Sequence, residues 1–228
     1  MGESGVITNN MEYYLSTRDI NAKFRSPEYE LLAREEVRLL RSALSRKPLT
    51  ILDIGSYDGR IGFVITDILN YQPQELYLTD FNDTFLKKCK DNIKAHETYI
   101  KVKKADAKKL PFPKSSFDLV LALGDTFCLI DRHDYHPSGR KVNNDPLNTF
   151  KIALKQGVSM LKSGGELIFS VDPEYVPDHK SVLSDVTSNF LNKELTLDLK
   201  DVQVQDSHRL RHLISLRILK NSEEDFYK

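Results

Sequence analysis

Short apolar runs alternate along the chain with longer segments whose apolar residues recur at helical spacing. The runs predict strands at 49–54, 75–79, 99–102, 117–123 and 166–171. The segments between and after them predict helices at 59–69, 83–96, 147–161 and 178–191, and an earlier helix begins at Pro27. Two more strands are predicted at 195–204 and 213–219. These two lie too close together for a helical crossover, so we expect an antiparallel hairpin at one edge of the sheet.

The order of these elements predicts an α/β fold with a seven-stranded, mostly parallel sheet and helices on both faces. One domain covers residues 26–220, after a polar arm or lid at 1–25 and before a short tail at 221–228. Within the domain, Asn82 is placed to cap the helix that follows it. The Gly164–Gly165 pair is expected to stop the helix that precedes it.

The composition narrows the class of protein. The chain has 228 residues, of which 40% are apolar, enough for one domain with a real core. Its 33 basic and 33 acidic residues balance, whereas non-specific nucleic-acid binders carry a basic excess that neutralises phosphates. No apolar run spans a bilayer, and the start of the chain lacks a signal-peptide pattern. Cys89 and Cys128 form no CxxC pair, so we expect free thiols, no metal site and a cytoplasmic location.

The sharpest candidate site ends the first predicted strand and opens the helix that follows, where doubly wound sheets bind ligands. The segment reads Asp53-Ile54-Gly55-Ser56-Tyr57-Asp58-Gly59. Gly55 allows a sharp turn close to a ligand, and Gly59 allows tight packing where the helix starts. The helix N-terminus offers N–H groups to an anionic ligand group. Asp53 is placed to bind a cationic one, directly or through water.

Acidic residues also follow the next two strands. Asp80 ends the second strand, where a carboxylate can accept hydrogen bonds from both hydroxyls of a ribose, and the apolar Phe81 comes directly after it. The third strand leads to Asp106-Ala107 and then to Leu-Pro-Phe-Pro at 110–113 and Ser-Phe-Asp-Leu-Val at 116–120. Asp118, which begins the fourth strand, is interpreted as structural.

Segment 53–59 resembles motif I of the class I S-adenosylmethionine-dependent methyltransferases, with Tyr57 in place of the middle glycine. The later series resembles the ubiquinone-biosynthesis-type (methyltransferase type 11-like) branch, and the likeness covers about residues 30–220. It implies a Rossmann-like domain that binds S-adenosylmethionine. The implied cofactor-binding residues are Asp53, Gly55, Ser56, Tyr57, Gly59, Asp80, Phe81, Asp106, Ala107, Leu123 and Gly124. Among them, Asp80 binds the ribose, Asp106 the adenine amino group, and the Ala107 amide a ring nitrogen.

The methyl acceptor is expected to lie against the loop after the fourth strand. This loop contains His133 and His136 beside Asp131 and Asp134, and one histidine is a candidate general base. A polar surface loop and a metal site are the alternatives. The Asn/Asp-Pro-Pro-aromatic motif of enzymes that methylate amino groups of nucleic-acid bases or of glutamine is absent from the sequence. We therefore expect a small-molecule acceptor that is methylated on nitrogen or oxygen, with no nucleic-acid or membrane partner.

Three other functions remain compatible with the sequence. One is a protein or RNA acceptor; the basic run at 101–109 and, more weakly, Arg209, Arg211 and His212 would suit contact with RNA or another anion. A non-catalytic cofactor-binding domain is favoured by Tyr57. A dehydrogenase is disfavoured by the terminal hairpin and by the Asp106-Ala107 series.

Overall fold

The computed structural model describes the greater part of the predicted domain. The described residues are 27–93, 99–124, 126–129, 145–174, 176–191, 196–205 and 210–219. The predicted arm at 1–25 and the tail at 221–228 lie outside them. No helix in these ranges is long and apolar enough to cross a membrane.

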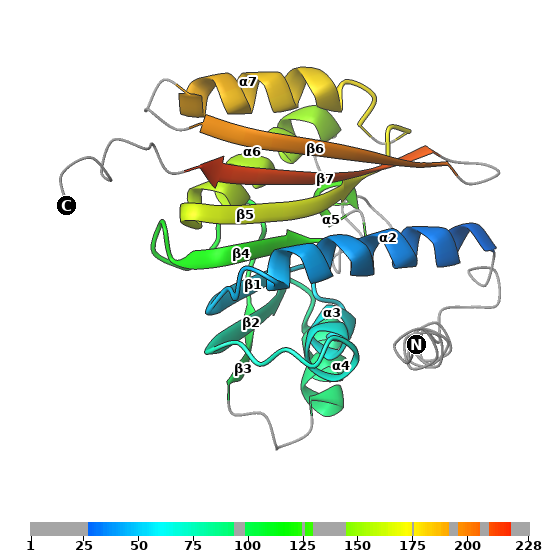
Figure 1. The fold of residues 1–228 in the computed structure, drawn as a ribbon, viewed down its shortest axis with the longest axis vertical. Coiled ribbons are helices and arrows are strands. Elements are labelled where there is room, and N and C mark those ends of the chain that lie inside the picture. The colour runs from blue at the N-terminus through cyan, green and yellow to red at the C-terminus, as the bar shows by residue number, and fades with distance from the viewer. Residues whose placement is uncertain are drawn as a thin grey trace.

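The centre of the fold is one seven-stranded sheet in the order β3-β2-β1-β4-β5-β7-β6 (Figure 1). Its strands are β1 (Thr50–Ile54), β2 (Glu75–Asp80), β3 (Ile100–Lys104), β4 (Phe117–Ala122), β5 (Leu161–Val171), β6 (Thr196–Gln205) and β7 (Leu210–Leu219). The first five strands pair in parallel. Strand β7 is antiparallel to both β5 and β6. The predicted Rossmann-like architecture with an antiparallel C-terminal hairpin is therefore confirmed.

Helices connect the strands and cover both faces of the sheet. They are α2 (Pro27–Leu44), α3 (Arg60–Phe63), a π-helical turn (Val64–Ile68), α4 (Asp83–Asn92), α5 (Thr126–Leu129), α6 (Pro146–Ser159) and α7 (His179–Leu191). Asn82 caps α4 as predicted, because its side chain accepts a hydrogen bond from the Thr84 N–H at 2.9 Å. In Figure 1, α2 crosses in front of the sheet and α6 lies behind it.

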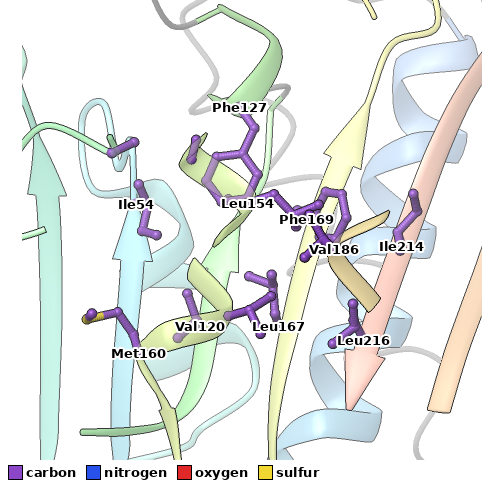
Figure 2. Close-up of a cluster of buried hydrophobic side chains, with 14 of the residues drawn as sticks. Ile54, Val120, Phe127, Leu154, Met160, Leu167, Phe169, Val186, Ile214 and Leu216 are labelled. Atoms are coloured by element: carbon purple, nitrogen blue, oxygen red, sulfur yellow. The ribbon is translucent and has the colours of Figure 1, made fainter. Parts of the chain in front are cut away.

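Two hydrophobic cores lie on opposite faces of the sheet. Alternate residues of β4 point to opposite faces. Leu119 and Leu121 pack in the core beneath α2 and α4, and Val120 and Ala122 pack in the core beneath α6 and α7. This alternation follows from the two-residue period of a strand. Figure 2 shows part of the second core, with Phe127, Leu154 and Phe169 packed between Ile54 of β1 and Ile214 of β7.

Three local features differ from the sequence prediction. The helix after β1 changes from α to π geometry, with the Leu69 N–H donating to the Val64 carbonyl at 2.9 Å. Helix α5 was not predicted. The Gly164–Gly165 prediction was wrong, since α6 already ends at Ser159 and both glycines lie inside β5.

The glycine pair instead forms an irregularity in β5. Phe117 pairs with Leu161 and Leu119 with Glu166, so the register between β4 and β5 shifts there. Gly164 has a φ of 80°, a left-handed conformation that glycine adopts without strain. A Cβ atom on Gly165 would lie 2.9 Å from the Lys162 carbonyl oxygen. The pair is therefore needed for the bulge and not for ending a helix.

Asp118 ties together the strand ends opposite the candidate site. Its Oδ2 atom accepts from the backbone N–H groups of Leu49 and Thr50, at 3.0 and 2.8 Å, and from the Thr50 hydroxyl. The Lys162 ammonium lies 3.1 Å from Oδ1. Burial opposes the charge, but the Thr50 hydrogen bonds and Lys162 outweigh it and lower the pKa of Asp118. This agrees with the structural role expected from the sequence.

We predict that Asp118→Ala lowers the free energy of unfolding by about 2 kcal/mol, because hydrogen bonds to a charged group are lost. Asp118→Asn keeps one oxygen acceptor and should cost less. Denaturant unfolding of the two variants measures the difference. Equal stability of parent and Asp118→Ala would contradict this role.

Candidate cofactor site

The candidate site lies where the parallel strands β1, β2 and β4 end side by side. Strand β1 is hydrogen-bonded to β2 on one side and to β4 on the other. In a doubly wound sheet, the strand order reverses at such a point. Ligands bind there, in the crevice outside the carboxyl ends of the strands. The fold therefore brings Asp53, Asp80 and Gly124 together at the carboxyl ends of the parallel strands.

Asp53 is the most unusual group at this edge. The residue is 1% exposed, and its Oδ2 atom has no hydrogen-bond partner in the described part of the chain. The pKa of Asp53 is raised to about 8: burial has the largest effect, the nearby carboxylates Asp80 and Glu36 act in the same direction, and a hydrogen bond from Ser56 opposes them. A buried carboxyl group with an unpaired oxygen suits a cationic hydrogen-bond donor such as an ammonium group.

Ser56 holds the ends of β1 and β2 together. Its hydroxyl donates to the Asp53 carbonyl at 3.0 Å and accepts from the Thr79 N–H at 2.8 Å. The Thr79 hydroxyl also donates to the Asp53 carbonyl, at 2.9 Å. These bonds fix the backbone on which Asp53 and Asp80 stand.

Two glycines shape the loop, as the sequence predicts for its turn. Gly55 has a φ of 71° and Gly59 a φ of 86°. A Cβ atom on Gly55 would overlap the side chain of Thr126 in α5, and one on Gly59 would lie 3.1 Å from the Cys89 sulfur. The space at Gly55 is thus filled by α5, an element that the sequence did not reveal.

Tyr57 takes the place of the middle motif glycine and adopts a left-handed backbone, with a φ of 53°. Its ring lies over α4, with its centroid 4.2 Å from that of Phe85. The Arg60 guanidinium and the Lys88 ammonium lie 5.2 and 5.7 Å from the same ring. These contacts hold the side chain against the α4 surface.

Asp80 is 6% exposed at the end of β2. Its Oδ1 atom accepts from the Asn82 N–H at 2.8 Å, and its Oδ2 atom accepts from the Tyr57 N–H at 3.2 Å. Burial raises the pKa of Asp80, while hydrogen bonds from the backbone of Asn82, Tyr57 and Phe81 act in the opposite direction. The two oxygens together have four lone pairs and these backbone donors do not use all of them, so the carboxylate keeps capacity for a further donor.

The remaining predicted residues lie at the ends of β3 and β4. Asp106 shapes the turn after β3, with Oδ1 accepting from the Lys108 N–H at 2.8 Å, and Ala107 is buried. Leu123 is buried at the end of β4. Gly124 has a φ of 68°, and a Cβ atom there would meet no atom of the described residues within 4 Å.

The candidate bases His133 and His136 lie outside the described residues, so their role stays a prediction. Within the described ranges, no group of three or more His, Cys, Asp or Glu side chains is placed to hold a metal ion. Sequence reasoning missed Glu36, which is 2% exposed in α2 and acts electrostatically on Asp53. Its signal is an acidic residue on a helix face that otherwise carries Val37, Leu40 and Leu44.

Comparison with protein families decides the class. Residues 51–143, which include β1 to β4 and the site, match the family described as a methyltransferase domain. The chain carries a methyltransferase domain. The enzymes of this class take their methyl group from S-adenosylmethionine. A comparison with curated proteins finds no relative.

Solved structures of methyltransferases share the fold. Magnesium protoporphyrin IX methyltransferase (ChlM) from Synechocystis PCC 6803 aligns with a TM-score of 0.59 and 13% identity, over 93% of this chain and 99% of its own. The N-methyltransferase NodS from Bradyrhizobium japonicum WM9 aligns with a TM-score of 0.58 and 19% identity, over 86% and 99%. A ribosomal protein L11 methylase from Lactobacillus delbrueckii subsp. bulgaricus aligns with a TM-score of 0.53 and 16% identity, over 82% and 78%.

The raised pKa of Asp53 predicts a pH dependence of stability. The pKa of this group is near 3.8 in the unfolded chain and near 8 in the folded methyltransferase. Its contribution to the free energy of unfolding is therefore complete below pH 3.8 and is lost as pH rises toward 8. Asp53→Asn keeps the shape and cannot ionise. In urea unfolding without cofactor, we expect stability to fall less between pH 5 and 8.5 in the variant than in the parent. The same decline in both proteins would contradict the assignment.

Proposed function

We propose that this methyltransferase transfers the methyl group of S-adenosylmethionine to a nitrogen or oxygen of a small-molecule acceptor, as a member of the ubiquinone-biosynthesis-type branch. The observation that carries the proposal is the pair of buried carboxyl groups, Asp53 and Asp80, on adjacent strands. Adjacent strands lie about 4.8 Å apart. Asp53 pairs with Leu78, two residues before Asp80, so the two acids are separated along the strands as well as across them. This separation suits a ligand with an ammonium group at one point and a ribose at another, as the cofactor has.

The residues fit the two ends of the cofactor. Asp53 would bind the ammonium group with its unpaired Oδ2 atom, and Asp80 would accept from the ribose hydroxyls. Phe81 and the turn at Asp106–Ala107 would face the adenine. The cofactor supplies an activated methyl group, so the protein's contribution is proximity and alignment. The acceptor would approach beside Gly124, where no atom of the described residues lies within 4 Å of the Cβ position.

The lysines of the outer strand β3 favour a small acceptor over RNA. The basic run of β3 is largely engaged within the protein: Lys101 pairs with Glu75, and Lys104 pairs with Asp83 at 2.6 Å. The Lys103 ammonium donates to the Pro111 carbonyl at 3.2 Å. Paired cations attract phosphates weakly. The name of ChlM gives a small acceptor for that enzyme and the name of NodS gives methylation on nitrogen, whereas the L11 methylase modifies a protein.

Methyl-labelled S-adenosylmethionine tests the acceptor class directly. The enzyme is incubated with benzylamine, tyramine and 4-methylphenol as small probes, with a lysine-rich protein, and with total RNA. We expect label in one of the small probes. Label confined to the protein or to the RNA would contradict the proposal.

A second test concerns Asp80. Hydrogen bonds to a charged group contribute roughly 1.5–3 kcal/mol, so Asp80→Ala should weaken cofactor binding about tenfold or more. Asp83→Ala is the matched control, because this nearby carboxylate is exposed and pairs with Lys104. Calorimetry with S-adenosylhomocysteine measures both affinities. Equal dissociation constants for parent and Asp80→Ala would reject Asp80 as the ribose ligand.

A further inference from the structure

A buried pair of histidines lies on the same side of the sheet as the cofactor site, at the end of β5. His212 of β7 pairs in register with Val171, the last residue of β5. His179 begins α7, directly after the turn that leaves β5. The two rings have their centroids 4.7 Å apart, and the residues are 3% and 2% exposed for His179 and His212. Both therefore lie at the carboxyl end of β5, which is the amino end of the antiparallel β7, on the same side of the sheet as the carboxyl ends of β1 and β4.

The hydrogen bonds fix which nitrogen of each ring carries the proton. His212 Nδ1 lies 2.8 and 3.0 Å from the two carboxylate oxygens of Asp201. His179 Nδ1 lies 3.1 Å from the Val176 carbonyl oxygen. A carboxylate and a carbonyl only accept, so each Nδ1 is the donor. In the neutral rings, both Nε2 atoms then hold a lone pair.

His179 Nε2 is the group that the fold leaves unused. It is buried and has no hydrogen-bond partner among the described residues. Buried polar atoms are normally satisfied, and exceptions in a folded protein point to a missing partner. That partner must be a donor, because the atom presents a lone pair.

The surroundings keep this ring neutral. Burial has the largest effect and lowers the pKa of His179, and the neighbouring basic groups His212 and Lys180 act in the same direction. The Val176 carbonyl and the Asp201 carboxylate oppose them. A neutral imidazole with a fixed Nδ1 donor and an open Nε2 is the form that acts as a general base.

We propose that His179 is the general base of the methyl transfer and that His212, held by Asp201, is its positioning residue. The inference rests on the proposed small-molecule acceptor. The acceptor's nitrogen or oxygen forms a bond to the methyl carbon, and the electron pair of the broken carbon–sulfur bond stays on sulfur. The proton of the attacking atom moves to His179 Nε2, and the imidazolium later releases it to water.

The position of the pair is compatible with this role. Strands β1, β4, β5 and β7 are successive neighbours, so at about 4.8 Å per step β7 lies about 10 Å from β4. A cofactor on β1 and β2 leaves the ends of β4, β5 and β7 for the acceptor. Nε2 is covered by protein atoms, so the acceptor reaches it only when part of this cover moves aside.

The test uses asparagine, whose amide nitrogen takes the place of Nδ1. His179→Asn keeps a donor to the Val176 carbonyl and removes Nε2 together with the far side of the ring. With the small probe that the parent methylates, we expect the rate to fall by on the order of 10²–10⁴ while affinity for S-adenosylhomocysteine is unchanged. The parent's kcat/KM should rise with pH through a pKa below the ordinary value of 6.5, and the variant should lose this step. Loss of this step in His133→Ala or His136→Ala, with the step kept in His179→Asn, would instead assign the base to the loop after β4.

Each other outcome has a defined meaning. If His179→Asn binds S-adenosylhomocysteine and turns over like the parent with the same pH step, His179 is not the base. If the parent binds S-adenosylhomocysteine but labels none of the small probes, the proposed acceptor class is wrong and the base assignment falls with it. If His179→Asn does not fold, Asp201→Asn decides. It keeps an oxygen acceptor for His212, and an unmoved pH step would overturn the proposal.

Discussion

The buried carboxyl group of Asp53 is the constraint on which the site depends. The fold places an ionisable side chain at 1% exposure with one oxygen unpaired, at the end of the strand that stands between β2 and β4. Such a group is unfavourable in the protein alone, because burial penalises its charged form. Binding of a cation would remove the penalty. The hydroxyls of Ser56 and Thr79 and the tight turn at Gly55 hold the strand ends so that Asp53 and Asp80 lie on neighbouring strands at one edge.

The sequence was sufficient for the order of the elements and the direction of the strands. Apolar runs of strand length separated by helical segments admit few topologies, because parallel strands need crossovers and the last two strands leave no room for one. The prediction from sequence failed for features that depend on long-range packing. The end of α6 and the bulge at Gly164–Gly165 depend on the register between β4 and β5. The four-residue helix α5 is too short to show a periodicity.

The candidate site divides in the same way. Asp53, Asp80 and the two loop glycines were found because their spacing around predicted strand ends carries the signal. The surroundings that give them their chemistry were not, since Glu36 acts on Asp53 from a helix that begins 26 residues before it in the chain. His179 and His212 are 33 residues apart and meet only after β7 inserts beside β5. A contact between residues so far apart in the sequence leaves no local motif.

Proton release on cofactor binding tests the central claim most directly. Asp53, with its pKa near 8, is mostly protonated at pH 6.5, and an ammonium group bound beside it would favour its ionised form. Calorimetry of S-adenosylhomocysteine binding at pH 6.5, repeated in buffers with different ionisation enthalpies, counts the protons released. The account predicts release approaching one proton for the parent, with none and weaker binding for Asp53→Asn. Equal proton release and equal affinity in the two proteins would contradict it.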